Sequence, residues 1–193
     1  MKTLITLIFM TFSLLLNAQV YKYKIICKGK DIGEIEVKKT VKDTAIYYDI
    51  TGRSTVTMFF TESIKYHLSS IYINGAMFYS SATIYLNDKV HFNSVVQQEN
   101  GYYTLNKKGH QSRFLGSIIY SGAMLYFTEP SGIDLIFSEI DNIEKNITKL
   151  ADHKYKIVNP KTNNASVFNY VDGILESADI DHTYVSFSIK RVY

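Results

Sequence analysis

The segment 61–97 constrains the fold most, because apolar and polar residues alternate through most of its length. Alternation with a period of two is typical of a strand that buries one face. Two turn signals, Asn74-Gly75 and Asn87-Asp88, divide the segment into three runs, and such pairs tolerate the positive φ angles of tight hairpin turns. The segment therefore predicts three antiparallel strands joined by hairpins.

The flanking segments continue the same pattern. Strands are expected from Val20 to Cys27, around Ile35, and from Ile46 onward, and a second series of hairpins occupies residues 154–192, with a turn at Asp172-Gly173. The composition of 16 Tyr and 11 Phe also favours strands. Altogether the sequence predicts about ten short strands.

Three segments break the alternation. Residues 107–113 are polar and contain a glycine, which indicates a loop. Residues 114–127 approximate helical spacing, although Gly116 and Gly122 oppose a helix. We expect a short helix there, lying across one opening of the sheet. Residues 141–146 are polar and are compatible with a loop or a helical turn.

The predicted fold class is mainly β: a single antiparallel meander curled into an open or closed β-barrel, or half-barrel, with one short helix. Strands in hairpin succession must hide one apolar face, and a barrel, a half-barrel and a sandwich all do so. Consecutive hairpins favour the meander. With 193 residues the chain suits one domain, which we place at residues 19–193.

Residues 1–18 are predicted to be a signal peptide. Lys2 supplies a positive start, an apolar run follows, and Ala18 is the small residue at the expected cleavage position. The alternative is an uncleaved N-terminal anchor. The single cysteine, Cys27, cannot form an intramolecular disulfide and is expected on the inner face of the first strand. Because of the predicted signal peptide, the protein is expected to be exported, and to be periplasmic or secreted.

Charge and motif content point away from several functions. The formal charge is only +3, and the lysines alternate with acidic residues, so no nucleic-acid partner is expected. The five histidines match no zinc spacing, so neither a metal nor a cofactor is predicted. Glu129 and Glu139 lie beside apolar runs. Paired carboxylates can perform acid–base work when they meet across a pocket, but capping of a helix or loop is the favoured role.

Three groups of residues together resemble a known family. They are Tyr23-x-Ile25 with Ile32-Gly33-Glu34, the run 125–130 (LYFTEP) followed by Phe137-Ser138-Glu139, and Tyr155-x-Ile157-x-x-Pro160 leading to Tyr170-x-x-Gly173-Ile174-Leu175. The chain resembles an uncharacterised family of short, secreted β-proteins of Gram-negative bacteria, classed as a domain of unknown function. The resemblance implies no catalytic residues. It implies a distant fold analogy to periplasmic lipoprotein carriers, which hold acyl chains in a half-barrel.

We therefore expect a non-enzymatic protein that encloses a lipid or another hydrophobic ligand in an apolar cavity. A structural or protein-interaction module of the cell envelope is one alternative, and a small outer-membrane β-barrel is another, since aromatic side chains and alternation also occur there. An enzyme that uses Glu129, Glu139 or a histidine is the last alternative. The sequence leaves the oligomeric state open. The residues expected to line the cavity are Tyr48, Tyr66, Phe78, Ile84, Phe92, Leu125 and Phe127.

Overall fold

The structure is a computed structural model that describes residues 17–57, 61–181 and 185–193. Most of the predicted signal peptide lies outside the described residues, so its cleavage stays a prediction. The described chain forms fourteen strands and one 3-10 helix, η1. Their bounds are β1 (Asn17–Cys27), β2 (Lys30–Lys42), β3 (Ala45–Thr57), β4 (Thr61–Ile73), β5 (Ala76–Leu86), β6 (Lys89–Gln98), β7 (Tyr103–Lys107), β8 (His110–Phe114), η1 (Gly122–Tyr126), β9 (Leu135–Ser138), β10 (Ile143–Ala151), β11 (Lys154–Val158), β12 (Ala165–Val171), β13 (Ile174–Ile180) and β14 (Phe187–Val192).

All fourteen strands belong to one antiparallel sheet with the order β8-β7-β6-β5-β4-β3-β2-β1-β14-β13-β12-β11-β10-β9. Consecutive strands therefore pair with each other within β1–β8 and within β9–β14, and the pairing of β1 with β14 joins these two series. β8 and β9 are the two edges of the sheet. The sheet does not close by strand pairing between these edges. The prediction of a single antiparallel meander curled into an open barrel is confirmed.

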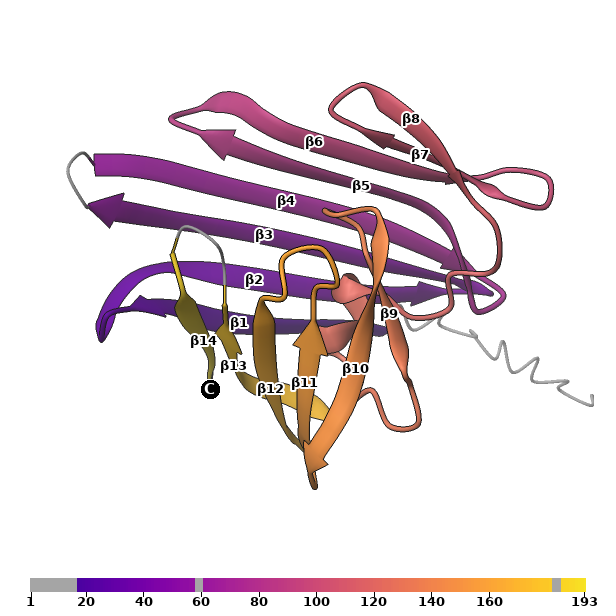
Figure 1. Ribbon diagram of the computed structural model, residues 1–193. Coiled ribbons are helices and arrows are strands. Elements are labelled where there is room, and N and C mark those ends of the chain that lie inside the picture. The colour runs from indigo at the N-terminus through magenta and orange to yellow at the C-terminus, as the bar shows by residue number, and fades with distance from the viewer. Residues whose placement is uncertain (1–16, 58–60, 182–184) are drawn as a thin grey trace, which may run out of the picture.

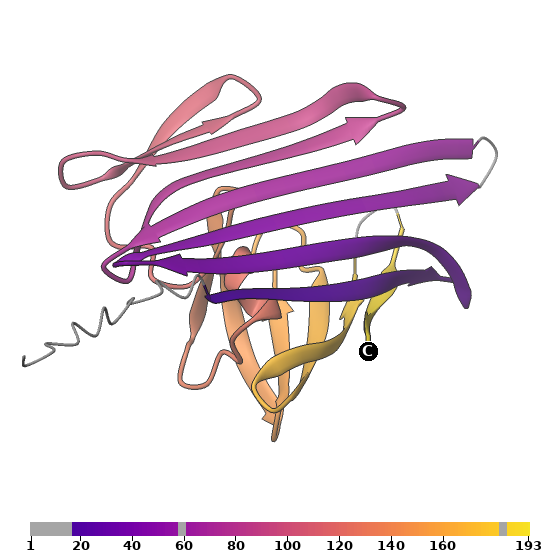
Figure 2. The same cartoon turned by 180° about the vertical axis from the view of Figure 1, so that it is seen from behind.

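The sheet folds over so that its two halves face each other (Figure 1). Strands β2 to β6, of ten to thirteen residues, form the long-strand half, and the shorter strands β9 to β14 form the other. The ends of β3 and β4 at residues 57 and 61 extend beyond β14, and η1 lies between the halves (Figures 1 and 2). One end of the inner face of the long strands consequently lies beyond the short-strand half.

The hairpin turns have the backbone geometry that their sequences predict. Asn74 and Gly75 have φ angles of 51° and 82°, and Asp172 and Gly173 have 51° and 76°. Positive φ at both central residues matches the right-handed twist of the flanking strands. Local sequence thus determines the register of these hairpins, which in turn decides the residues that face the interior.

The core lies between the two halves and around η1. Tyr23, Val37, Ile50 and Leu68 are buried on the long side, and Ala123 and Leu125 of η1 are buried between the halves. The inner faces of β4 and β5 carry three small buried residues, Ser70, Ser80 and Ala82. The hydroxyls of Ser70 and Ser80 satisfy each other with a 2.8 Å hydrogen bond.

Three local predictions need correction. The segment 107–113 is not a loop, because a two-residue turn at Lys108-Gly109 joins β7 to β8. The predicted helix over 114–127 shrinks to η1, which lies inside the barrel rather than across an opening. The first part of the segment 114–127 is extended, because the Ile118 carbonyl accepts a hydrogen bond from Met77 N–H. The segment 141–146 is neither a loop nor a helical turn throughout, since β10 begins at Ile143.

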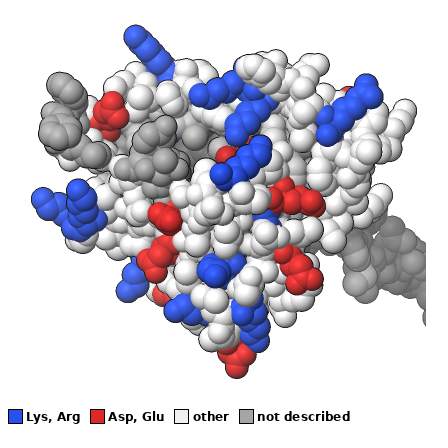
Figure 3. Space-filling view, in the orientation of Figure 1, with Lys and Arg blue, Asp and Glu red and all other residues white. Residues whose placement is uncertain are grey.

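The outer face carries the charges. Lys22 pairs with Glu36 at 3.3 Å and Lys24 pairs with Asp31 at 2.9 Å, and all four side chains are at least half exposed. Figure 3 shows basic and acidic residues interspersed over the visible face. Cys27 is buried, as predicted for the inner face of the first strand. The barrel therefore has its apolar side inward and its charged side outward.

Candidate functional site

Three of the predicted ligand-binding residues lie side by side on the inner face. Tyr66 of β4 is opposite Ile84 of β5, and Ile84 is opposite Phe92 of β6. Residues that are directly opposite on antiparallel strands have Cβ atoms about 5 Å apart. The three side chains therefore form a continuous row across three strands.

Three others gather around η1 instead. Phe127 follows η1 directly, and its ring centroid lies 5.6 Å from that of Tyr48 on β3. Leu125, within η1, is only 7% exposed. Tyr48 also contacts Tyr72 edge to face at 5.7 Å. Tyr48, Leu125 and Phe127 belong to the packed core, so η1 occupies the space in which the sequence placed a ligand.

Phe78 faces the opposite way. It is 40% exposed, and the register explains why: Ile71 is opposite Tyr79 while Tyr72 is opposite Met77, so Phe78 is the extra residue of a β-bulge. A bulge reverses the alternation beyond it, and Met77 takes the inner position, where it is fully buried. The expectation that Phe78 shares the inner face with Ile84 is wrong.

Burial falls steadily along the inner face of β4. Ser70 and Leu68 are buried, whereas Tyr66 and Ile64 are only half-buried. The neighbouring strand repeats the trend, with Ala82 buried and both Ile84 and Leu86 half-buried. The half-buried stretch lies on the side of η1 toward the 57–61 end of the long strands. We name this stretch, together with the buried Phe92 opposite Ile84, the end face; its members are Ile64, Tyr66, Ile84, Leu86 and Phe92.

Tyr66 marks the border between the end face and the η1 region. Its hydroxyl lies deep enough that burial raises its pKa well above the ordinary value, and the nearby Glu139 and Tyr126 add to the rise. Its ring is part of the half-buried row, while its polar tip points toward the interior. A tyrosine with an apolar body and a buried tip is suited to the boundary between a core and an accessible surface.

Lysine side chains border the end face at Phe92. The ammonium nitrogens of Lys107 and Lys108 each lie 5.5 Å from the centroid of the Phe92 ring. Lys107 also reaches the turn before β10, 3.5 Å from Asp141 Oδ1, and Lys145 contacts Asp141 Oδ2 at 2.7 Å. The ion pair of Lys107 with Asp141 thus joins β7 to the short-strand half at this end.

Glu139 holds η1 in place from the other half. Its carboxylate accepts hydrogen bonds from Ser121 Oγ at 2.5 Å, from Ala123 N–H at 3.1 Å and from Gly122 N–H at 3.1 Å. Burial raises the pKa of the Glu139 carboxyl, although these hydrogen bonds oppose the rise. The predicted capping role is confirmed for Glu139, because it satisfies the free N–H groups at the start of η1.

Glu129 has a different set of partners. Tyr155 Oη donates to Glu129 Oε1 at 2.6 Å, and His153 Nδ1 lies 2.9 Å from Glu129 Oε2. Burial opposes ionisation of Glu129, but the bonds from Tyr155 and His153 outweigh it, so its pKa lies below the ordinary value. Among the described residues, the carboxyls of Glu129 and Glu139 therefore have separate hydrogen-bond partners.

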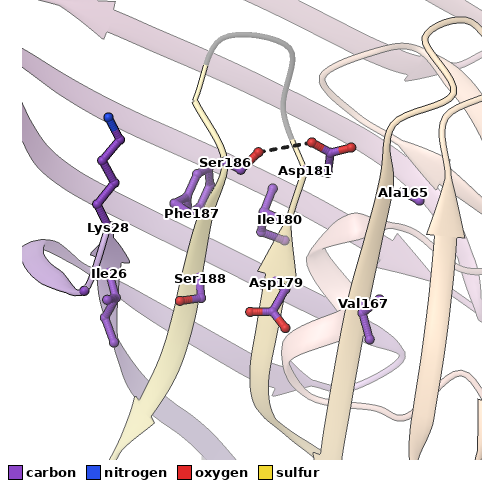
Figure 4. Close-up of a pocket in the computed structure, with 11 residues that line it drawn as sticks. Ile26, Lys28, Ala165, Val167, Asp179, Ile180, Asp181, Ser186, Phe187 and Ser188 are labelled. Atoms are coloured by element: carbon purple, nitrogen blue, oxygen red, sulfur yellow. Dashed lines mark hydrogen bonds between the residues drawn. The ribbon is translucent and has the colours of Figure 1, made fainter. Parts of the chain in front are cut away.

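An open groove lies on the outer face, across β1, β14, β13 and β12 (Figure 4). Its volume is about 330 Å³. Ile26 is opposite Ser188, Ser188 is opposite Asp179, and Asp179 is opposite Val167, so one row of the register forms its floor. The groove contains none of the predicted ligand-binding residues. Within it, Ser186 Oγ donates a hydrogen bond to Asp181 Oδ1 at 3.1 Å.

Within residues 17–57, 61–181 and 185–193, no three His, Cys, Asp or Glu side chains gather closely enough to hold a metal ion. His182 lies outside this part of the chain. Over the same residues, no helix has the length and apolar character needed to cross a membrane.

Comparison with known proteins identifies the family. The model of DUF6134, a domain of unknown function, matches residues 23–192. The chain belongs to this family. The match spans nearly the whole barrel, from within β1 to the end of β14, so the fourteen strands are the DUF6134 domain itself. The prediction of an uncharacterised family is confirmed.

Among solved structures, the DUF6134 chain is similar to the beta-barrel-like protein of domain of unknown function DUF1849 from Brucella abortus. The TM-score is 0.59 at 10% sequence identity, and the alignment covers 91% of this chain and 95% of the other. At this identity the likeness concerns the fold alone, and it supports the barrel-like arrangement along the whole chain. No curated protein matches the sequence.

Sequence reasoning missed the lysines at the border of the end face. Tyr103, Leu105 and Lys107 have the same parity in β7, and the first two are buried. Extending the alternation by one step would have placed Lys107 on the inner face. The prediction of a loop from residue 107 prevented this inference.

Proposed function

We propose that this protein is an exported, non-enzymatic binding protein that holds the apolar part of a ligand against the end face. One observation carries the proposal: five apolar inner-face side chains, Ile64, Tyr66, Ile84, Leu86 and Phe92, follow one another beyond η1, and four of them are only half-buried. Ligand sites are usually lined by accessible apolar surface on a concave face.

The site proposed here is smaller than the cavity expected from the sequence. Tyr48, Leu125 and Phe127 pack together around η1, so they contribute rigidity rather than contact with the ligand. The end face then offers one continuous apolar row to a chain-like group. Burial of each methylene of such a group contributes about 0.8 kcal/mol, which makes binding depend on chain length.

A neutral fluorescent probe tests the proposal. N-phenyl-1-naphthylamine becomes brighter in an apolar site, and we expect saturable binding to the protein secreted from the full-length chain. Ile84→Asp places a carboxylate in the centre of the end face, and we expect the affinity to fall roughly tenfold or more because an unpaired charge is poorly tolerated there. Phe78→Asp is the matched control, because Phe78 lies on the same strand but faces outward.

The outcome against the proposal is equal loss, or no loss, of probe binding in the two variants. A circular dichroism spectrum and a melting curve establish that each variant is folded. Mass spectrometry of an organic extract of the purified protein provides an independent check, since an end-face ligand acquired during secretion should be recovered in less than stoichiometric amount from Ile84→Asp and in full from Phe78→Asp.

A second candidate function rests on the outer face. Tyr47 is opposite Ile71, and Ile71 is opposite Tyr79, next to the bulged Phe78. Tyr47 and Phe78 are each 40% exposed. This aromatic patch supports an interaction module. Phe78→Asp should then abolish a concentration-dependent assembly seen by light scattering, while Ile84→Asp should leave it intact.

The remaining alternatives receive less support. The ion pairs of Lys22 with Glu36 and of Lys24 with Asp31 lie on the face that an outer-membrane barrel turns toward lipid. An enzyme would have the contact of Glu129 with His153 and Tyr155 as its strongest acid–base group, and none of these three residues lines the outer-face groove.

A further inference from the structure

Two ammonium groups share one aromatic ring at the edge of the end face. Lys107 and Lys108 are consecutive, yet both nitrogens lie 5.5 Å from the Phe92 centroid. The tight turn explains this, because Lys108 has a φ angle of 50° and its N–H donates to the Asn93 carbonyl at 3.0 Å. The backbone thereby turns both lysines toward Phe92, which is only 9% exposed beneath them.

The local charge is not balanced. Asp141 is the carboxylate that pairs with Lys107, and it is shared: Lys145 contacts it at 2.7 Å, whereas Lys107 is 3.5 Å away. Lys108 forms no ion pair in the described part of the chain. Three ammonium groups and one carboxylate therefore meet where the apolar row ends, which leaves an excess of positive charge next to apolar surface.

This arrangement complements a molecule with an apolar chain and a negative end. Phe92, Ile84 and Tyr66 occupy neighbouring strands, so the row that begins at the lysines extends across two strand spacings of ~4.8 Å each, or ~10 Å in total. A chain that lies along the row places its end group beside Lys107 and Lys108. Ammonium groups donate charge-assisted hydrogen bonds to carboxylate and phosphate oxygens.

We propose that the ligand of the end face is a single-chain amphiphile with an anionic headgroup, bound by Lys107 and Lys108. This inference rests on the proposed function and adds the class of ligand to it. Carboxylate and phosphate headgroups share the chemistry that the lysines recognise. The apolar row supplies affinity, and the lysine pair supplies preference for charge and orientation of the chain.

The test compares headgroups on one chain length. Dodecanoate, dodecyl phosphate and neutral dodecyl maltoside, each below its critical micelle concentration, compete with N-phenyl-1-naphthylamine for the protein secreted from the full-length chain. We expect the anionic competitors to bind about fivefold tighter than the maltoside at low salt, since a partly exposed ion pair contributes up to ~1 kcal/mol. The preference should shrink as salt is added.

Two variants locate the effect. Lys107→Met combined with Lys108→Met keeps the apolar stems over Phe92 and removes both charges, so the preference for anions should disappear while binding of the maltoside remains. Lys38→Met is the matched control, because Lys38 is an exposed residue on the outer face of β2, and the preference should persist. If the double variant is unstable, Lys108→Met alone should reduce the preference, because Lys108 lies in an exposed turn.

Each result has a distinct meaning. Binding of all three competitors without preference, or an unchanged preference in the lysine variants, overturns the anionic class and leaves the proposed apolar site standing. Failure of every amphiphile to displace the probe, together with failure of the probe to bind, overturns both. A stronger preference for dodecanoate indicates a fatty-acid-like ligand, and a stronger preference for dodecyl phosphate indicates a phospholipid-like one. Both results support the anionic class.

Discussion

The two ends of the barrel interior use the same strand pattern for different purposes. Around η1 the inner-face residues Tyr48 and Leu68 are buried, and Tyr48 packs against Phe127, which directly follows η1. Beyond η1 the same strands present Tyr66 and Ile84, which are only half-buried. Alternation in sequence therefore determines which side chains face inward. The cover supplied by the other half determines whether an inward side chain becomes core or remains available.

The largest expected effect is on stability at the covered end. Leu125→Ala removes buried side-chain atoms from η1, and we expect the free energy of unfolding to fall by about 3 kcal/mol, as for other buried leucines. Ile84→Ala is the matched change at the end face and should cost about 1 kcal/mol or less, because Ile84 is half-buried and leaves a smaller cavity. Urea denaturation of both variants measures the difference.

Equal losses from Leu125→Ala and Ile84→Ala would contradict the comparison, since they would mean that both ends of the interior are packed alike. When probe binding is measured, the order of the two effects should be reversed. Ile84→Ala should weaken binding of the naphthylamine probe. Leu125→Ala should leave the affinity close to that of the unchanged protein at temperatures where the variant is folded.

A smaller effect concerns the anchor of η1. The pKa of Glu139 is raised by burial, so the folded protein binds this proton more tightly than the unfolded chain. Its contribution to stability is complete below the ordinary value of 4.5 and is lost as the pH rises through the raised pKa. Glu129 and Asp141, whose pKa values are lowered, have the opposite dependence.

Glu139→Gln isolates this contribution. We expect the free energy of unfolding of the unchanged protein, relative to that of Glu139→Gln, to increase when the pH is lowered from 7 to 4. Denaturation of both proteins at the two pH values checks the sign. A difference that is constant with pH, or that increases toward pH 7, would show that the carboxyl is not held at a raised pKa in the folded state.

The smallest expected effect is local: it concerns the contact of His153 with Glu129, outside both ends of the barrel interior. The hydrogen bond with Glu129 raises the pKa of His153 above its ordinary value of 6.5. Any stabilisation from this contact is therefore present below that value and is lost as the pH rises through the raised pKa. In Glu129→Gln the NMR titration of His153 should shift to lower pH. In Tyr155→Phe, which preserves the contact of Glu129 with His153, the midpoint should stay raised.

Much of the architecture was predictable because it depends on local rules. Pairs such as Asn74-Gly75 and Asp172-Gly173 determine hairpins through backbone angles alone, and the meander follows from their succession. Glu139 was predictable as a capping group because it follows an apolar run. The pairing of β1 with β14 was not predictable, since it joins residues more than 160 positions apart and has no turn to signal it.

The site was less predictable, for reasons that particular residues illustrate. Phe78 was misplaced because a bulge shifts the alternation, and an isolated bulge leaves no period in the sequence. Tyr48, Tyr66 and Phe92 were correctly placed on the inner face. Which of them is covered depends on where η1 packs, and that depends on a hydrogen bond from Ser121 to Glu139 of the other half.

The pairing of β1 with β14 also sets an order of events during synthesis. β14 is made after the other thirteen described strands, yet it occupies an interior place in the sheet, between β13 and β1. Until it arrives, β1 has a hydrogen-bonding edge without a partner, the kind of edge that recruits other chains. The two meanders can each form hairpins early, but they cannot join before residues 187–192 are available. A nascent chain stalled just short of β14 would therefore be a template for aggregation, and secretory chaperones that cover the β1 edge would protect it.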